Sequence, residues 1–345
     1  MNLNKLLFLL IIVCLASCEK DTPDEVGKYE KGIFVINEGP FQSGNGSITY
    51  FNPDNNLASQ NIFQEENEGL KLGNIAQSMT VARDMAYLLI NNAGVIQIVN
   101  ADDFKDQGQI EGINQPRNMI VANDSKAYVS SWGVDGFSGQ VSVVNLNTNG
   151  VASNIEVGGG PESMLVVGNE LYITKSGGFG RDSLLLIVNT ETDLITDTII
   201  VGDNPIGIVK DINNQIWVLS RGHSDWVDPS LSTSGRLDKI VNKEVVASFD
   251  VPNGADNLNI SANGNRLFFT AAGSVISHDI DEQSYQGNSI IEQFFYALEV
   301  DPSSGNLFAA DAKDFASQGE VIIFDEQGEE ISRFDAGIIP KYEVC

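Results

Sequence analysis

The stretch that decides the fold is RNMIVANDSKAYVSSW at residues 117–132, followed by QVSVVNLNTNG at 140–150 and ASNIEV at 152–157. Four short runs rich in β-branched and apolar residues are separated by the turn sequences NDSK and NTNG and by a longer loop, which predicts four antiparallel strands. The aromatic Tyr128 lies in the second run, between a small and an aliphatic residue. This unit provides a template for the rest of the chain.

The same unit recurs seven times. Its second strand is marked by Ile33-Phe34-Val35, Ala86-Tyr87-Leu88, Ala127-Tyr128-Val129, Leu171-Tyr172-Ile173, Ile216-Trp217-Val218, Leu267-Phe268-Phe269 and Leu307-Phe308-Ala309. The aromatics are 53, 41, 44, 45, 51 and 40 residues apart, and no segment shows a helical period. Four antiparallel strands at this period predict an all-β fold, a seven-bladed β-propeller. A β-sandwich is the alternative, but it does not require so regular a period.

The two ends of the chain are predicted to complete one blade together. The first repeat starts at its second strand, GIFVIN (32–37), and GIIPKYEV (337–344) is similar to the GINQPRNMIV that begins the third blade. Residues Ile338–Val344 are therefore expected to supply the missing inner strand. Because this pairing removes two open sheet edges, residues 32–345 should form one closed domain.

The composition excludes several functional classes. The chain has 20 Lys and Arg against 47 Asp and Glu, a formal net charge of −27. Nucleic-acid binding requires clustered basic residues, which this chain lacks, so no nucleic-acid partner is expected. Two histidines and three cysteines without a CxxC pair offer little to haem or zinc, so we expect no cofactor and no metal.

The first eighteen residues are typical of a bacterial lipoprotein precursor. Lys5 precedes an apolar run from Leu6 to Leu15, which is too short to cross a bilayer and is typical of a signal peptide. Leu15-Ala16-Ser17-Cys18 resembles the lipobox, which implies cleavage before Cys18 and acylation of that cysteine. An ordinary signal peptide that contains a cysteine is the alternative. We predict a signal peptide at 1–17, and the lipidated Cys18 with a flexible tether at 18–31.

The residues after Cys18 also suggest a location. Glu19-Lys20-Asp21 resembles the export signal of surface lipoproteins in the Bacteroidota. This resemblance implies a protein of the outer membrane that faces the cell exterior and contacts the membrane only through its lipid anchor. An anchor that faces the periplasm is the alternative.

The repeat resembles that of the YVTN/YncE-like propellers. The opening GIFVINEGPFQSGNGSITYFNP (32–53) is similar to the start of a family of Bacteroidota surface lipoproteins, the BtuG family, which captures vitamin B12. The resemblance covers nearly all of the mature chain, but its motifs specify blades rather than a binding site. The ending GIIPKYEVC (337–345) departs from the GIIPGGFYF-like ending of such proteins. The resemblance implies that cobalamin or another corrinoid is bound and passed to a TonB-dependent transporter.

The two faces of the predicted propeller differ in character. Loops between the second and third strands emerge beside the junctions between blades, and we call this side the loop face. The other turns, such as NTNG and ANGN, form the hairpin face and are short and polar. The distance from the repeat's aromatic to the closing Asn or Asp is 18, 17, 17, 25 and 17 residues in blades one, three, four, five and seven, against 13 and 11 in blades two and six. Long loops therefore make the loop face the expected binding face.

These long loops contain aromatic and charged residues, the types that dominate binding hot spots. The residues expected to contact a small-molecule ligand are Phe41, Trp132, Phe137, Phe179, Arg181, Arg221, His223 and Trp226. The alternative is that each ring packs on its own loop.

Two further groups of residues could carry chemistry. Arg117, Asn118, Glu162, Asp256 and Asn257 lie near the predicted channel mouth, where oxygen ligands could hold Ca²⁺ as in lactonase-like propellers, although polar residues also line water-filled channels. His223-Ser224-Asp225 contains an acid–base pair, but no nucleophile motif accompanies it. His278 is expected at the surface or at a sheet edge.

The leading interpretation is a non-enzymatic protein that captures a scarce small molecule at the cell surface. One alternative is a propeller hydrolase or lactonase with a metal in the central channel. The other is an adhesion or scaffold protein that uses its acidic surface to bind a macromolecule.

Overall fold

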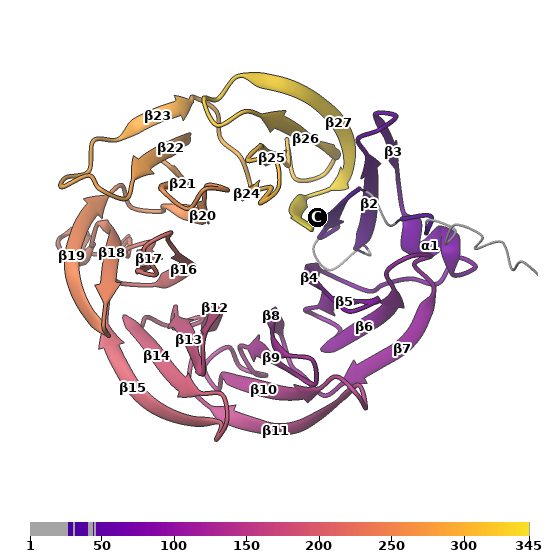
Figure 1. Cartoon of the computed structure of the whole chain (residues 1–345), viewed down its shortest axis with the longest axis horizontal. Coiled ribbons are helices and arrows are strands. Elements are labelled where there is room, and N and C mark those ends of the chain that lie inside the picture. The colour runs from indigo at the N-terminus through magenta and orange to yellow at the C-terminus, as the bar shows by residue number, and fades with distance from the viewer. Residues whose placement is uncertain (1–26, 30–31, 41–43, 45, 345) are drawn as a thin grey trace, which may run out of the picture.

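The computed structural model describes residues 27–29, 32–40, 44 and 46–344, with the backbone alone for 342–344. Its strands form seven four-stranded antiparallel sheets arranged around a central axis (Figure 1). The predicted seven-bladed β-propeller is therefore confirmed.

Blades two to seven each use four consecutive strands. In each of these blades the first strand lies nearest the central axis and the fourth lies at the outer edge (Figure 1). Blades two to four consist of β4 (Ala76–Ala82), β5 (Met85–Ile90), β6 (Val95–Asn100), β7 (Asp106–Glu111), β8 (Pro116–Asn123), β9 (Lys126–Ser131), β10 (Gln140–Asn145), β11 (Gly150–Glu156), β12 (Pro161–Val167), β13 (Glu170–Lys175), β14 (Leu184–Asn189) and β15 (Leu194–Ile200). Blades five to seven consist of β16 (Pro205–Lys210), β17 (Ile216–Ser220), β18 (Gly235–Val241), β19 (Glu244–Val251), β20 (Asp256–Ile260), β21 (Arg266–Ala271), β22 (Ser274–Asp279), β23 (Asn288–Ile291), β24 (Ala297–Val300), β25 (Leu307–Asp311), β26 (Gln318–Phe324) and β27 (Glu330–Ile338).

Blade one joins the two ends of the chain, as predicted. Its order is β28 (Pro340–Val344), β1 (Ile33–Asn37), β2 (Ser47–Asn52) and β3 (Leu57–Ser59), and Phe34 pairs with Val344 across the closure. The closing strand starts later than the predicted Ile338, because β27 continues to that residue. Ile339 then turns the chain with a φ of 56° before Pro340.

Five junctions between blades share one backbone conformation. The residue before the inner strand has a positive φ in blades one to five, at Ile339, Ile75, Gln115, Gly160 and Asn204. Its carbonyl accepts a hydrogen bond of 2.7–3.2 Å from the N–H of the first residue after the second strand of the same blade. The pairing of the inner strand shifts register within its first residues in all five blades. The fold thus repeats one local geometry around the channel mouth.

The apolar core lies between and within the blades, and the repeat supplies its largest side chains. All seven aromatics of the repeat are buried, with exposures between 0% and 6%. His278 is also buried, at 1% exposure, with its ring next to those of Trp217 and Phe249. The expectation that His278 lies at the surface or a sheet edge was wrong, because its strand, β22, packs against the rings of Trp217 and Phe249 from blade five.

Two short helices interrupt the strands. The α-helix α1 (Ile62–Glu66) follows the three-residue β3 and buries Ile62 and Phe63, and a 3₁₀ helix spans Pro229–Leu231. Sequence periodicity did not predict α1, since a five-residue helix is too short to display a helical period.

Candidate functional site

The repeated junction places two rings of side chains around the channel mouth on the loop face. The first residues after the second strands of blades one to five are Glu38, Asn91, Trp132, Ser176 and Arg221. The second residues of the matching inner strands are Lys341, Gln77, Arg117, Glu162 and Ile206. Backbone geometry alone therefore brings together residues that are far apart in the sequence.

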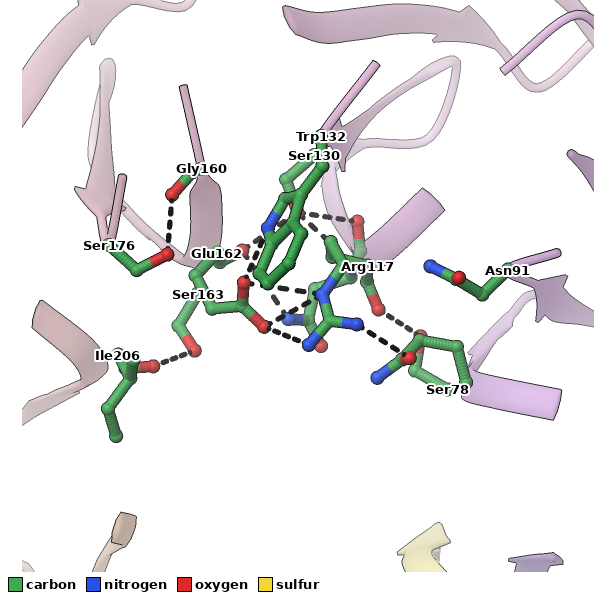
Figure 2. A network of polar contacts seen from close by, with 12 residues as sticks. Ser78, Asn91, Arg117, Ser130, Trp132, Gly160, Glu162, Ser163, Ser176 and Ile206 are labelled. Atoms are coloured by element: carbon green, nitrogen blue, oxygen red, sulfur yellow. Dashed lines mark hydrogen bonds and ion pairs between the residues drawn. The ribbon is translucent and has the colours of Figure 1, made fainter. Parts of the chain in front are cut away.

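Trp132, Arg117 and Glu162 form the centre of this arrangement (Figure 2). The Arg117 guanidinium donates to the Glu162 carboxylate at 2.7 and 3.0 Å and lies 4.5 Å from the centroid of the Trp132 ring. The indole Nε1–H donates to the other Glu162 oxygen at 2.8 Å, and Arg117 also donates to Gln77 at 2.8 Å. The indole is thus held by a hydrogen bond at its edge and by a cation on its face.

The charges of this group remain balanced. Burial alone would raise the pKa of Glu162, but the charge and hydrogen bonds of Arg117 outweigh it, so the pKa lies below its usual range. Two further pairs stand at the mouth: Lys341 contacts Glu38 at 3.1 Å, and Arg221 pairs with Asp256. The mouth therefore presents compensated ion pairs in a strongly acidic protein.

Two more of the predicted ligand contacts, Phe179 and Phe137, lie beside the Trp132 ring of this group. Phe179 lies edge-on to Trp132 with ring centroids 5.6 Å apart, and Phe137 lies edge-on to Phe179 at 6.2 Å. Phe179 packs directly on the backbone of Gly136, where a Cβ would stand 2.1 Å from the ring. Phe137 and Phe179 are nevertheless 55% and 66% exposed. The two rings therefore form an exposed apolar surface, and the contact with Gly136 holds Phe179 in place without covering it.

Two cavities border the Trp132 indole. The first, which we call the Trp132 groove, has a volume of about 470 Å³ and is lined by Ile75, Asn91, Asn92, Ala93, Gly94, Asn114, Gln115, Arg117, Trp132, Val134 and Phe179. The second, which we call the Asn204 pocket, has about 170 Å³ and is lined by Arg117, Trp132, Glu162, Ser176, Gly178, Gly180, Asn204, Ile206 and Arg221. Trp132 and Arg117 line both cavities and so form the wall between them.

The charged residues predicted in the loops of blades four and five lie next to this site. Arg181 forms an ion pair with Asp203, whose carboxylate also accepts from the Thr233 hydroxyl at 2.8 Å. The backbone N–H of His223 donates to the Thr233 hydroxyl at 3.0 Å, so His223 stands beside the same carboxylate. The ion pair with Arg181 keeps the pKa of Asp203 below its usual value.

The remaining predicted residues lie elsewhere. Trp226 is at the tip of the blade-five loop, where it is 90% exposed and lines neither cavity. Below it, Asp225 accepts the N–H groups of Val227 and Asp228 at 2.9 and 2.8 Å. Phe41 and the predicted lipidation site Cys18 lie outside the described residues.

The residues considered for Ca²⁺ are mostly engaged with one another. Arg117 neutralises Glu162, Arg221 neutralises Asp256, and the Asn257 amide donates to Thr270 at 3.0 Å. In the described part of the chain, no group of three or more His, Cys, Asp or Glu side chains could hold a metal ion.

Below the mouth lies a channel cavity of about 230 Å³. It is lined in part by Glu299, and burial raises the pKa of this carboxyl to about 8.

Sequence reasoning missed Gln77, Asn204 and the pairing of Arg117 with Glu162. The sequence does mark the positions of Arg117 and Glu162, because each follows a proline at the start of an inner strand. The sequence does not show that these positions from neighbouring blades meet.

A family model described as a domain of unknown function (DUF5074) matches residues 31–337. The chain belongs to this family. No curated protein matches the chain. The family is thus established without an assigned activity, and the resemblance to the BtuG and YncE-like proteins stays a prediction.

Many solved structures share the fold of this DUF5074 protein. A quinonprotein alcohol dehydrogenase-like protein from Bacteroides thetaiotaomicron has a TM-score of 0.69 at 11% identity, covering 92% of this chain and 78% of that one. A functionally unknown protein from Desulfotomaculum acetoxidans has a TM-score of 0.65 at 11% identity, covering 89% and 99%. Hydrazine synthase from Kuenenia stuttgartiensis has 0.56 at 15% identity, covering 75% and 86%. At these identities the similarity establishes the fold alone.

In the part of the chain that the structure describes, no helix is long and apolar enough to cross a membrane.

Proposed function

We propose that this protein is a non-enzymatic capture protein that binds a small molecule on its loop face, at the Trp132 groove. The observation that carries the proposal is an indole fixed by Glu162 and Arg117 beside the exposed rings of Phe179 and Phe137. Pre-positioned aromatic side chains bury a large area at low ordering cost, which suits binding. The carboxylates at the mouth are engaged in ion pairs, which gives less support to a hydrolase.

The first ligand to test is a corrinoid such as cobalamin, which the resemblance of the opening sequence suggests. The groove offers rings for an apolar surface and the amides of Asn91, Asn92 and Asn114 for neutral polar edges. Removing a buried aromatic anchor typically costs about 2 kcal/mol, or roughly thirtyfold in affinity. Trp132→Ala should therefore weaken binding by about this factor.

The test is a titration of the soluble chain from residue 19 onward with cobalamin and with cobinamide, followed by tryptophan fluorescence and calorimetry. Asn147→Ala, on the hairpin face, is the matched control and should bind normally. If neither corrinoid binds at micromolar concentration, the corrinoid assignment fails, while capture of another ligand stands.

We also propose that the protein is anchored to the outer membrane through Cys18, faces the exterior, and passes its ligand to a TonB-dependent transporter. The position of Tyr29 supports this arrangement. Its N–H donates to the Asp102 carbonyl at 3.0 Å, in a turn of the hairpin face, and its ring packs on Tyr50 and Phe104. The start of the described chain is thus fixed on the hairpin face, opposite the Trp132 groove.

Two experiments test the anchoring and the transfer. Cys18→Ala should move the protein from the membrane fraction to the soluble fraction, and its retention in membranes would contradict lipid anchoring. Detergent-solubilised outer membranes should yield the protein together with a TonB-dependent transporter. If it purifies without one, the transfer step has no support.

A further inference from the structure

The Asn204 pocket contains a buried acceptor without a partner. The amide nitrogen of Asn204 donates to the Gly222 carbonyl at 2.7 Å, whereas its Oδ1 atom is buried and, among the described residues, accepts no hydrogen bond. A buried polar atom left unpaired costs free energy, so this site favours a ligand group that brings a donor.

The other polar groups of the pocket favour a ligand group that is neutral and can also accept. Arg117 and Arg221 line the pocket as donors, and each is already neutralised, by Glu162 and Asp256 respectively. A ligand carboxylate would bring no donor for Asn204 and would add a negative charge beside Glu162. An ammonium group would bring no acceptor for the guanidinium groups. A neutral group with both functions satisfies both sides of the pocket.

The size of the pocket limits which neutral ligand group can occupy it. Its volume of about 170 Å³ compares with roughly 30 Å³ for one water molecule, so it holds more than a hydroxyl group. We infer that the Asn204 pocket receives a primary carboxamide of the captured ligand, whose NH₂ donates to Asn204 Oδ1 and whose carbonyl accepts from Arg221. This inference rests on the proposed capture at the Trp132 groove, because the indole forms the wall that the two cavities share.

A series of three small probes tests this chemistry on the unmodified chain. Benzamide carries a ring and a carboxamide, acetophenone carries the ring and an acceptor only, and benzoate carries the ring and a charge. Saturation-transfer NMR at millimolar concentration should detect benzamide, with acetophenone and benzoate each about tenfold weaker. Equal binding of benzamide and acetophenone, or no transfer to benzamide, would overturn the inference.

Two glycine variants test whether the preference for benzamide over acetophenone comes from Asn204. Asn204→Gly removes the unpaired acceptor and keeps the backbone conformation, since glycine already occupies the equivalent junction position 160. It should abolish the preference for benzamide over acetophenone. Asn214→Gly removes an asparagine of similar φ from a turn of the hairpin face and should leave the preference unchanged. A preference that persists in Asn204→Gly would also overturn the inference.

The outcomes separate this inference from the proposed function. Corrinoid binding that depends on Trp132, without any preference for the carboxamide probe, would leave capture in place and remove the carboxamide subsite. A carboxamide preference that depends on Asn204, without corrinoid binding, would keep the subsite and remove the corrinoid.

Discussion

Trp132 and Trp226 both stand in long loops on the same face of the propeller, but their surroundings are opposite. Trp132 donates to Glu162, carries Arg117 on its ring face and lines two cavities. Trp226 is 90% exposed at a loop tip and lines neither cavity. A ring that is already fixed loses little freedom when a ligand binds, so we propose that the ligand binds at the loops of blades three and four.

The largest expected effect comes from breaking the ion pair that fixes Trp132. Glu162→Ala leaves the Arg117 charge buried without its carboxylate, and such a loss typically costs about 3 kcal/mol of the free energy of unfolding. Urea denaturation measures this cost, and the fluorescence of Trp132 should change as well. Glu244→Ala, at an exposed strand end, should cost less than about 0.5 kcal/mol. Equal losses in the two variants would show that the ion pair does not support the site.

A glycine pair tests whether the loop packing around Phe179 is specific. Gly136→Ala adds a methyl group 2.1 Å from the Phe179 ring at a φ of +75°, whereas Gly168→Ala, on the hairpin face, meets no atom within 4 Å at a φ of +60°. Both changes strain the backbone, but only the first also overpacks a contact, which costs about 2 kcal/mol more. Thermal melting of both variants measures the difference. Identical melting temperatures would mean that Phe179 moves aside freely.

Two buried carboxyl groups, those of Glu162 and Glu299, also have opposite surroundings. Among the described residues, Glu162 is held by Arg117, whereas no ion pair or hydrogen bond engages the Glu299 carboxyl, and burial raises its pKa to about 8. The folded chain keeps this proton at a pH where the unfolded chain has lost it, so stability should fall as the pH rises from about 4.5 to about 8.

Glu299→Gln should remove that decline. The Glu299 side chain is largely buried but keeps some exposure, and solvent screening of the exposed part reduces the effect of its raised pKa. We therefore expect the wild-type chain to lose at least about 1 kcal/mol relative to the variant between pH 5 and pH 8. Denaturation of both chains across this range measures the difference, with Glu244→Gln as the control that keeps the decline. Parallel curves for wild type and Glu299→Gln would contradict the assignment.

The smallest expected effect is that of Trp226→Ala on stability. A side chain that is 90% exposed has little packing to lose, so the free energy of unfolding should change by less than about 0.5 kcal/mol. A loss above about 1 kcal/mol would show that the ring packs on its own loop.

Sequence alone predicted the fold because the repeat encodes it locally. Tyr128 and its six equivalents are all buried, and the turns between strands carry ordinary turn residues. Apolar rings in long loops stand out from a polar surface, so Trp132, Phe137 and Phe179 could be selected from the sequence, and the structure brings their rings together. That they contact a ligand stays a prediction. The sequence could not show which of Trp132 and Trp226 is held rigidly. The difference is the contact of Trp132 with Glu162, which lies 30 residues further along the chain in the next blade.

The central claim is that the fixed ring, Trp132, dominates ligand binding on the loop face. The most direct measurement is calorimetric titration of the wild type, Trp132→Ala and Trp226→Ala with cobalamin under the same conditions. The account predicts a loss of roughly thirtyfold in affinity for Trp132→Ala and less than about threefold for Trp226→Ala. An equal loss in both variants, or a larger loss for Trp226→Ala, would contradict it.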